Sequence, residues 1–159
     1  MTAPASLKSR FLQLGRHRAV ARAIRATVPL DKAITRLSGG RVHLVPEALL
    51  PQITLTTVGR RSGVARAVPL LYVNDGEDFV VIASNFGQEK HPAWSYNLEA
   101  NPDAEVLLGT RRIPVRARRM TESDRKRLWP SITAMWPAYD DYIDWAGDRT
   151  IKLYRLTPR

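Results

Sequence analysis

The strongest constraint on the fold is a series of short apolar segments separated by turn residues between positions 53 and 97. Apolar and β-branched residues dominate 53–58, 68–73 and 78–83, which indicates three strands. Residues 74–77 (Asn-Asp-Gly-Glu), between the second and the third, have the chemistry of a hairpin turn. The pattern therefore predicts antiparallel strands joined by short turns.

The rest of the chain adds strands and a few helices. Strands are predicted over 104–108, 113–117 and 151–156, and helices over 92–100, 121–135 and 138–146. This order lacks the βαβ alternation of a doubly wound sheet. The glycines at 59 and 63 also lack the spacing of dinucleotide-binding or P-loop motifs. We therefore expect a mainly β (α+β) fold, a small barrel of about six mostly antiparallel strands with peripheral helices.

The first 45 residues are strongly basic and form a predicted segment of their own. The chain has a formal net charge of +10, and residues 1–45 hold nine Lys or Arg against one Asp. Apolar spacing predicts a basic amphipathic helix over 7–28 and a short helix over 31–38. The basic helix fits an anionic membrane surface and, equally, a helix packed on the domain with solvated arginines. The predicted division is 1–45 as the helical segment and 46–159 as the barrel.

Composition excludes several kinds of chemistry. The chain has no cysteine, so it has no disulfide, thiolate metal site or cysteine nucleophile. Its three histidines show no metal-ligand spacing, and we expect no metal. No apolar run reaches the ~18 residues of a membrane span, and the polar start does not resemble a signal peptide. We expect a cytoplasmic protein, peripheral on the inner face of the membrane if residues 7–28 bind lipid.

Two turns carry the candidate binding groups. Residues 59–63 (Gly-Arg-Arg-Ser-Gly), with Arg66 beyond, offer guanidinium groups, a hydroxyl and backbone N–H groups to an anion, or form an ordinary solvated turn. Residues 84–87 (Ser-Asn-Phe-Gly) follow a strand and can present donors to a planar ligand, or form a plain loop with Gly87 at positive φ. His91 beyond this loop is expected to face solvent.

Aromatic residues are concentrated near the C-terminus. Trp136, Tyr139 and Tyr142 build either a core or the wall of an apolar pocket, and the two tyrosines share a helix face. Asp148 and Arg149 suggest a local ion pair. No arrangement for covalent catalysis is visible, so in an enzyme the reactive atom would belong to a cofactor that the protein binds and orients.

Four segments together resemble one family. They are LTTVGRRSGVARAVPL (55–70), IASNFGQEKHPAW (82–94), NLEANP (97–102) and WPSITAMWPAYDDYIDWAGDRTI (129–151). The chain resembles the deazaflavin-dependent nitroreductases and quinone reductases of actinobacteria over roughly residues 45–159. The resemblance implies a split β-barrel that binds the deazaflavin cofactor F-420 and transfers a hydride to a quinone-like or nitroaromatic acceptor.

The resemblance also implies the site residues. The phosphate and glutamyl tail of the cofactor would contact Arg60, Arg61, Ser62 and Arg66. The deazaflavin ring would contact Val68, Pro69, Leu70, Ile82, Ala83, Ser84, Asn85, Ala93, Trp94 and Asn97. The acceptor would contact Trp136, Tyr139 and Tyr142, with Tyr139, Tyr142 and Ser84 as the hydroxyls that assist catalysis. The family's N-terminal segment is linked to membrane association, which agrees with a lipid-soluble quinone.

Three positions depart from the family pattern, and two other functions compete with it. Asn85 stands where family members carry lysine, Leu71 replaces an aromatic residue, and Trp136 stands where the nitro-reducing member has tyrosine. One rival is a split-barrel oxidoreductase that uses FMN, whose phosphate suits the same arginines. The other is a non-catalytic basic module for membrane or nucleic acid. Nucleic acid is the weaker partner, because the aromatic residues do not interleave with the basic ones. The sequence does not set the oligomeric state.

Overall fold

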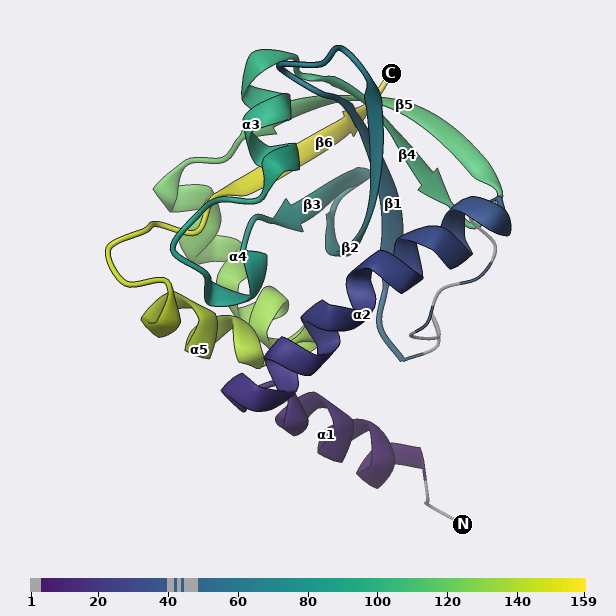
Figure 1. The fold of residues 1–159 in the computed structure, drawn as a ribbon. Helices are drawn as coiled ribbons and strands as arrows, with labels where there is room; N and C mark the ends of the chain where they lie inside the picture. Colours follow the sequence, from purple (N-terminus) through teal and green to yellow (C-terminus); the bar gives the residue numbers. More distant parts are fainter. Residues whose placement is uncertain (1–3, 40–41, 43, 45–48) are drawn as a thin grey trace.

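The computed structural model describes residues 4–39, 42, 44 and 49–159. Strands form the centre of the molecule and helices lie outside them (Figure 1). The strands are β1 (Gln52–Val58), β2 (Ala65–Asp75), β3 (Asp78–Ile82), β4 (Asp103–Leu108), β5 (Arg111–Arg119) and β6 (Leu153–Pro158). The helices are α1 (Pro4–Leu14), α2 (Arg18–Leu37), α3 (Ala93–Ala100), α4 (Glu122–Met135) and α5 (Ala138–Trp145), with a 3-10 turn η1 (Asn85–Gly87).

The strands close into a barrel in the order β1-β2-β3-β6-β5-β4, and every pairing is antiparallel. The predicted hairpin between β2 and β3 is confirmed: Asp75 pairs with Asp78, and Gly76 between them has a φ of 66°. Glycine takes this positive φ without a steric penalty. The predicted mainly β (α+β) barrel of antiparallel strands with peripheral helices is therefore confirmed.

The alternate residues of strand β3 pack in two separate hydrophobic clusters. In β3, Phe79 and Val81 belong to the cluster inside the barrel, whereas Val80 and Ile82 belong to a cluster outside it. Successive strand side chains point to opposite faces, so one short strand supports both clusters. Helices α4 and α5 cover the outer cluster, where Ile132 is fully buried.

The start of α4 is fixed by a capping box. The Thr121 hydroxyl accepts a hydrogen bond from the Asp124 backbone N–H at 3.1 Å, and the Asp124 carboxylate accepts one from the Thr121 N–H at 3.2 Å. The first turn of a helix leaves N–H groups without partners, and these bonds satisfy two of them.

Asp75 at the end of β2 connects the hairpin to α4 and β6. Its carboxylate accepts two hydrogen bonds from Arg127, at 2.7 and 2.9 Å, and a further one from Arg155. These bonds and the two positive charges hold the pKa of Asp75 below its usual value, although partial burial acts in the opposite direction.

The N-terminal segment differs from its prediction. The helix predicted over 7–28 is divided between α1 and α2, and the short helix predicted over 31–38 is the end of α2, which continues through Pro29 to Leu37. The two helices are separated at residues 15–17, where Gly15 lies against Trp136: a Cβ atom there would be 2.2 Å from Cζ2 of the indole. Residues 1–3, 40–41, 43 and 45–48 lie outside the described part of the chain, and the division at 45/46 stays a prediction.

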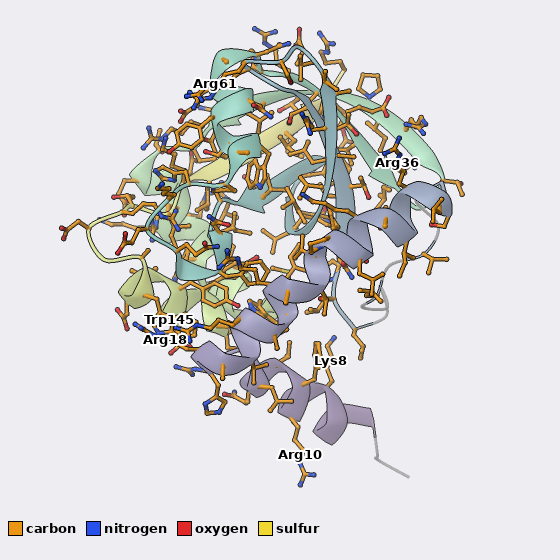
Figure 2. All side chains as sticks on the ribbon, viewed as in Figure 1. Lys8, Arg10, Arg18, Arg36, Arg61 and Trp145 are labelled. Atoms are coloured by element: carbon orange, nitrogen blue, oxygen red, sulfur yellow. The ribbon has the colours of Figure 1, made fainter. Side chains whose placement is uncertain are left out.

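Both N-terminal helices contact the C-terminal aromatic region. The Phe11 ring lies 5.9 Å from the Trp136 ring, and Arg16 forms an ion pair of 2.8 Å with Asp141. At the start of α2, the Arg18 guanidinium lies 5.3 Å from the centre of the Trp145 ring (Figure 2). Figure 1 shows α2 crossing the outside of the barrel from α5 toward the end of β4. The segment is therefore packed on the domain, which was one of its two predicted states.

Candidate cofactor and substrate cleft

A cleft of about 1140 Å³ lies between the barrel, helix α3 and helix α2. Its walls come from β2, the end of β3, the loop that follows, α3, α2 and the aromatic region around α5. This volume is large enough for a cofactor together with a second small molecule. Every site residue expected from the sequence lines the cleft except Ala83, which is fully buried. The lining set is Arg60, Arg61, Ser62, Arg66, Val68, Pro69, Leu70, Ile82, Ser84, Asn85, Ala93, Trp94, Asn97, Trp136, Tyr139 and Tyr142.

One end of the cleft is formed by the basic turn at residues 59–63. The Gly59 N–H donates to the Val64 carbonyl, and the Gly63 N–H donates to the Gly59 carbonyl, both at 2.8 Å. A Cβ atom on Gly59 would lie 2.5 Å from the Ser62 hydroxyl oxygen, so a larger residue there would force the Ser62 side chain to turn away. The turn is therefore closed by hydrogen bonds of its own backbone.

Asn97 holds this turn against the barrel. Its side-chain carbonyl accepts a hydrogen bond from the Arg60 backbone N–H at 3.0 Å, and its amide donates to the Thr57 hydroxyl at 3.0 Å. Both Asn97 and Thr57 are buried, so losing either partner would leave a buried polar group unsatisfied. Asn97 was expected at the ring of the cofactor. In this structure its amide group is bonded to the protein, so it positions the turn.

The arginines at this end have no carboxylate partners among the described residues. The Arg60 guanidinium lies 4.6 Å from the centre of the Tyr96 ring, a cation–π contact. Arg61 and Arg66 are exposed, and no described Asp or Glu lies within ion-pair distance of either. Figure 2 shows Arg61 at the end of the molecule opposite α1. Three uncompensated guanidinium groups at one mouth favour an anionic ligand.

The middle of the cleft is apolar. Val68, Pro69 and Leu70 of β2 lie along one wall, and Ile82 ends β3 beside them. Trp94 of α3 borders the cleft but is 7% exposed and packs edge-on against Tyr154 at 5.6 Å inside the barrel. Its ring is therefore mainly part of the core. An apolar slot of this kind suits a flat ring system.

The loop after β3 has an unusual backbone. Asn85 and Phe86 have φ angles of 46° and 54°, values that residues other than glycine adopt rarely. The Asn85 side chain stabilises this shape by donating to the Lys90 carbonyl at 2.8 Å and accepting from the Gln88 amide at 3.1 Å. The positive φ predicted for Gly87 is confirmed at 71°. Asn85, which stands where family members carry lysine, thus stabilises the loop through its side-chain hydrogen bonds.

Arg149 holds the same loop from behind, which the sequence did not indicate. Its guanidinium donates to the carbonyls of Ala83 at 3.0 Å, Ser84 at 2.6 Å and Gln88 at 2.7 Å. The expected ion pair with Asp148 is wrong, because the side chain is directed to these carbonyls. The tertiary structure brings these three carbonyls together around Arg149, and no local sequence motif indicates such an arrangement. Partial burial lowers the pKa of Arg149.

His91 is half-buried and lines the cleft, in contrast to the solvent-facing position expected for it. Its Nδ1 atom lies 3.2 Å from Nη1 of Arg149. Arginine can only donate, so Nδ1 accepts and the neutral ring carries its proton on Nε2. Partial burial lowers the pKa of His91, and the charges of Lys152 and Arg149 lower it further. His91 is therefore a neutral donor at the side of the cleft.

The other end of the cleft is aromatic and buried. Trp136, Tyr139 and Tyr142 are each 5% exposed or less, and the two tyrosine rings lie 5.8 Å apart, edge to face. The Trp136 indole N–H donates to the Tyr142 hydroxyl at 3.3 Å. Burial raises the pKa of both tyrosines, so their hydroxyls stay protonated at neutral pH. This end offers phenol hydroxyls in an apolar setting.

Helix α2 supplies the remaining wall of the cleft. None of the site residues predicted from the sequence lies on this helix. Ile24 lies one helical turn before Thr27 and Val28 on α2, and all three line the cleft. The apolar spacing that predicted an amphipathic helix was the available signal, but it did not show which surface the helix covers.

Two kinds of feature are absent from the described part of the chain. No group of three or more His, Cys, Asp or Glu there could hold a metal ion. Among the same residues, no helix has the length and apolar character needed to cross a membrane.

Comparison with known proteins agrees with this geometry. The family model described as "F420H(2)-dependent quinone reductase" matches residues 29–158. The Mycobacterium tuberculosis protein Rv1261c, named an F420H(2)-dependent quinone reductase, is 37% identical over 106 residues, 65% of this chain and 70% of its own. Rv3178 of the same organism, provisionally given the same name, is 36% identical over 110 residues, 69% of this chain and 92% of its own.

Solved structures give the same result. One described as an "F420-H2 Dependent Reductase (FDR-A)" is 32% identical, with a TM-score of 0.62 over 72% of this chain and 98% of its own. Another, described as a domain-swapped dimer, is 29% identical, with a TM-score of 0.64 over 80% of this chain and 96% of its own. From the family match, the relatives and the cleft, we conclude that the chain belongs to the F420H(2)-dependent quinone reductase family.

Proposed function

We propose that this chain binds reduced F-420 along the cleft and transfers a hydride from it to a quinone-like or nitroaromatic acceptor at the aromatic end. Family membership makes the chain an F-420-dependent oxidoreductase. The observation that carries the residue assignments is that one continuous cleft joins uncompensated arginines, an apolar slot and buried phenol hydroxyls.

The residues present fit this cofactor. Arg60, Arg61, Arg66 and the Ser62 hydroxyl would hold the phosphate and the glutamyl tail, because they provide positive charge without internal carboxylate partners. The apolar residues of β2 and Ile82 would lie against the deazaflavin ring. The same arginines would suit the phosphate of FMN, which remains the minor alternative.

The aromatic end would hold the acceptor. When bound, reduced F-420 supplies the hydride, and the chain's own groups orient the acceptor and stabilise the charge that appears on its oxygen. The Tyr142 oxygen accepts from Trp136, which leaves the Tyr142 proton available to a ligand. No hydrogen bond joins the Tyr139 hydroxyl to another described residue, so it too can donate. Burial of all three aromatic residues keeps water from the reacting atoms.

Cofactor binding is tested by fluorescence titration of the purified protein with F-420, with FMN in parallel. Saturable binding of F-420 alone supports the assignment, and binding of FMN alone moves the chain to the flavin alternative. Absence of binding by either leaves the arginines without the proposed role.

The acceptor end is tested with Tyr142→Phe. This change removes the hydroxyl and keeps the ring, so we expect turnover to fall by roughly 10- to 100-fold while the F-420 dissociation constant changes less than about twofold. An equal loss of cofactor affinity would show that Tyr142 serves the cofactor instead.

We also propose that the basic N-terminal segment, residues 7–28, contacts an anionic membrane on the inner face of the cell envelope. Lys8 and Arg10 of α1 are exposed, as are Arg22 and Arg25 on α2. Figure 2 shows Arg10 pointing away from the barrel. Co-sedimentation with vesicles of anionic and of neutral lipid tests this role. Equal binding to both, or to neither, would contradict it.

A further inference from the structure

We propose that the backbone N–H groups of Ser84 and Asn85 form an oxyanion hole for the acceptor, and that Arg149 is the residue that positions them. This inference rests on the proposed function, because it assigns a role in the same hydride transfer. It concerns main-chain donors, which side-chain motifs do not reveal.

Arg149 determines which way these peptide groups face. Its guanidinium donates hydrogen bonds to the carbonyls of Ala83 and Ser84, at 3.0 and 2.6 Å. No described peptide bond is cis, and in a trans peptide the N–H points opposite to the carbonyl. The N–H groups of Ser84 and Asn85 therefore both point away from Arg149.

That direction is toward the cleft. Ser84 and Asn85 line the cleft, whereas Arg149 does not. Neither N–H group forms a hydrogen bond with another described residue. The backbone of Ser84 is in the right-handed helical region (φ −69°, ψ −35°), whereas Asn85 has a positive φ of 46°. A right-handed residue followed by a left-handed one turns successive N–H groups to the same side and creates a concavity for an anion.

The loop also adjoins the aromatic end of the cleft. The Phe86 ring lies 6.1 Å from the Tyr142 ring, and a Cβ atom on Gly87 would be 3.1 Å from the Tyr142 Cα atom. Ser84, Asn85 and Tyr142 thus lie at neighbouring parts of the lining of one cleft. An acceptor oxygen placed there would receive hydrogen bonds from the main-chain N–H groups and from the Tyr142 hydroxyl.

The chemical step balances with these groups. A hydride leaves the reduced cofactor and bonds to the acceptor, so the cofactor is oxidised by two electrons and the acceptor is reduced by two. The acceptor oxygen then carries a negative charge, which the two N–H groups stabilise until Tyr142 or solvent supplies a proton. Arg149 has no carboxylate partner among the described residues, and its positive charge polarises both peptide groups toward the cleft.

Two variants at position 84 distinguish the role of the Ser84 backbone N–H from that of its hydroxyl. Ser84→Ala removes the hydroxyl and keeps the N–H, whereas Ser84→Pro removes both. Proline fits the observed φ of −69°, and the preceding residue continues the strand pairing through its N–H bond to the Lys152 carbonyl. The comparison therefore isolates the N–H group, with thermal unfolding as the check that both variants fold.

The first readout does not depend on turnover. 4-Nitrophenol is titrated by absorbance on the protein saturated with oxidised F-420, because its phenolate imitates the charged acceptor oxygen. We expect Ser84→Pro to weaken the preference for phenolate over phenol by about tenfold relative to Ser84→Ala. Arg149→Lys, which keeps the charge and loses the fork that binds several carbonyls, should show the same direction of change.

The second readout is single-turnover hydride transfer with a quinone. We expect Ser84→Pro to be about 100-fold slower than Ser84→Ala, with F-420 dissociation constants within twofold of each other. Equal phenolate preference and equal rates in the two variants would overturn the proposal, as would a loss confined to F-420 affinity. Failure of the unmodified protein to bind F-420 would instead refute the proposed function.

Discussion

The contact between Gly15 and Trp136 predicts that adding one methyl group far from the barrel will destabilise the protein. Gly15 is buried at the break between α1 and α2, and a Cβ atom there would lie 2.2, 2.6 and 2.9 Å from three atoms of the indole six-membered ring. These distances are well inside van der Waals contact. The indole is 5% exposed and has little free space into which it can move.

The size of the effect follows from two opposing contributions. Forcing an extra methyl group into a packed region costs about 1–3 kcal/mol. Replacing glycine with alanine also restricts the unfolded chain, which returns about 0.4–1 kcal/mol because the φ of Gly15 is outside the left-handed region. We therefore expect Gly15→Ala to lower the free energy of unfolding by about 1–2 kcal/mol.

A double-mutant cycle tests the cause. Trp136→Phe removes the ring atoms that meet the new methyl group, so Gly15→Ala should cost little in that background. Urea denaturation of the four proteins gives the coupling free energy, and Arg22→Ala on the exposed face of α2 serves as a control for changes in helix propensity. If Gly15→Ala costs the same with Trp136 and with Phe at that position, steric overlap with the indole is not the reason.

Three further changes test other parts of the structure. Thr121→Ala breaks the capping box of α4 and should lower the free energy of unfolding by about 1 kcal/mol, measured by urea denaturation; no change would mean that water replaces the cap. The pKa of Asp75 is lowered in the fold, so its ionised form stabilises the protein above about pH 4, and this contribution is lost as the pH falls through the lower folded value. Asp75→Asn should therefore lower the melting temperature at pH 7 and reduce its dependence on pH below 4; parallel curves would contradict this. Asn97→Ala frees the Arg60 N–H and should raise the F-420 dissociation constant by roughly tenfold, whereas an unchanged constant would show that the turn holds its shape alone.

The barrel was predictable from the sequence because its signals are local. Alternating β-branched residues and the Asn-Asp-Gly-Glu turn are sufficient to place β2, β3 and their hairpin, and every predicted strand overlaps an observed one. The resemblance to a family then brought together residues from distant segments, and all of them except Ala83 line one cleft. Ala83 belongs beneath the surface, where its carbonyl binds Arg149.

The remaining features depend on contacts between distant segments. Nothing near Gly15 in the sequence shows that an indole from residue 136 will occupy the space beside it, and the sequence did not predict that the helix over 7–28 is divided there. Arg149 was paired with its neighbour Asp148 for the same reason: a local reading favours adjacent charges, whereas the fold offers three carbonyls. The positions of Thr27 and Val28 on the cleft wall also follow from how α2 crosses the barrel.

Because one wall of the cleft is a helix, the two faces of a bound ligand would meet surfaces of very different stiffness. Strand β2 is tied to β1 and β3 by continuous ladders of backbone hydrogen bonds. Helix α2 is attached to the domain by side chains, such as Arg18 on Trp145. Substitutions on α2 can therefore change the width of the cleft without disturbing the barrel, so the range of acceptors could diversify among relatives while the cofactor-binding surface stays constant.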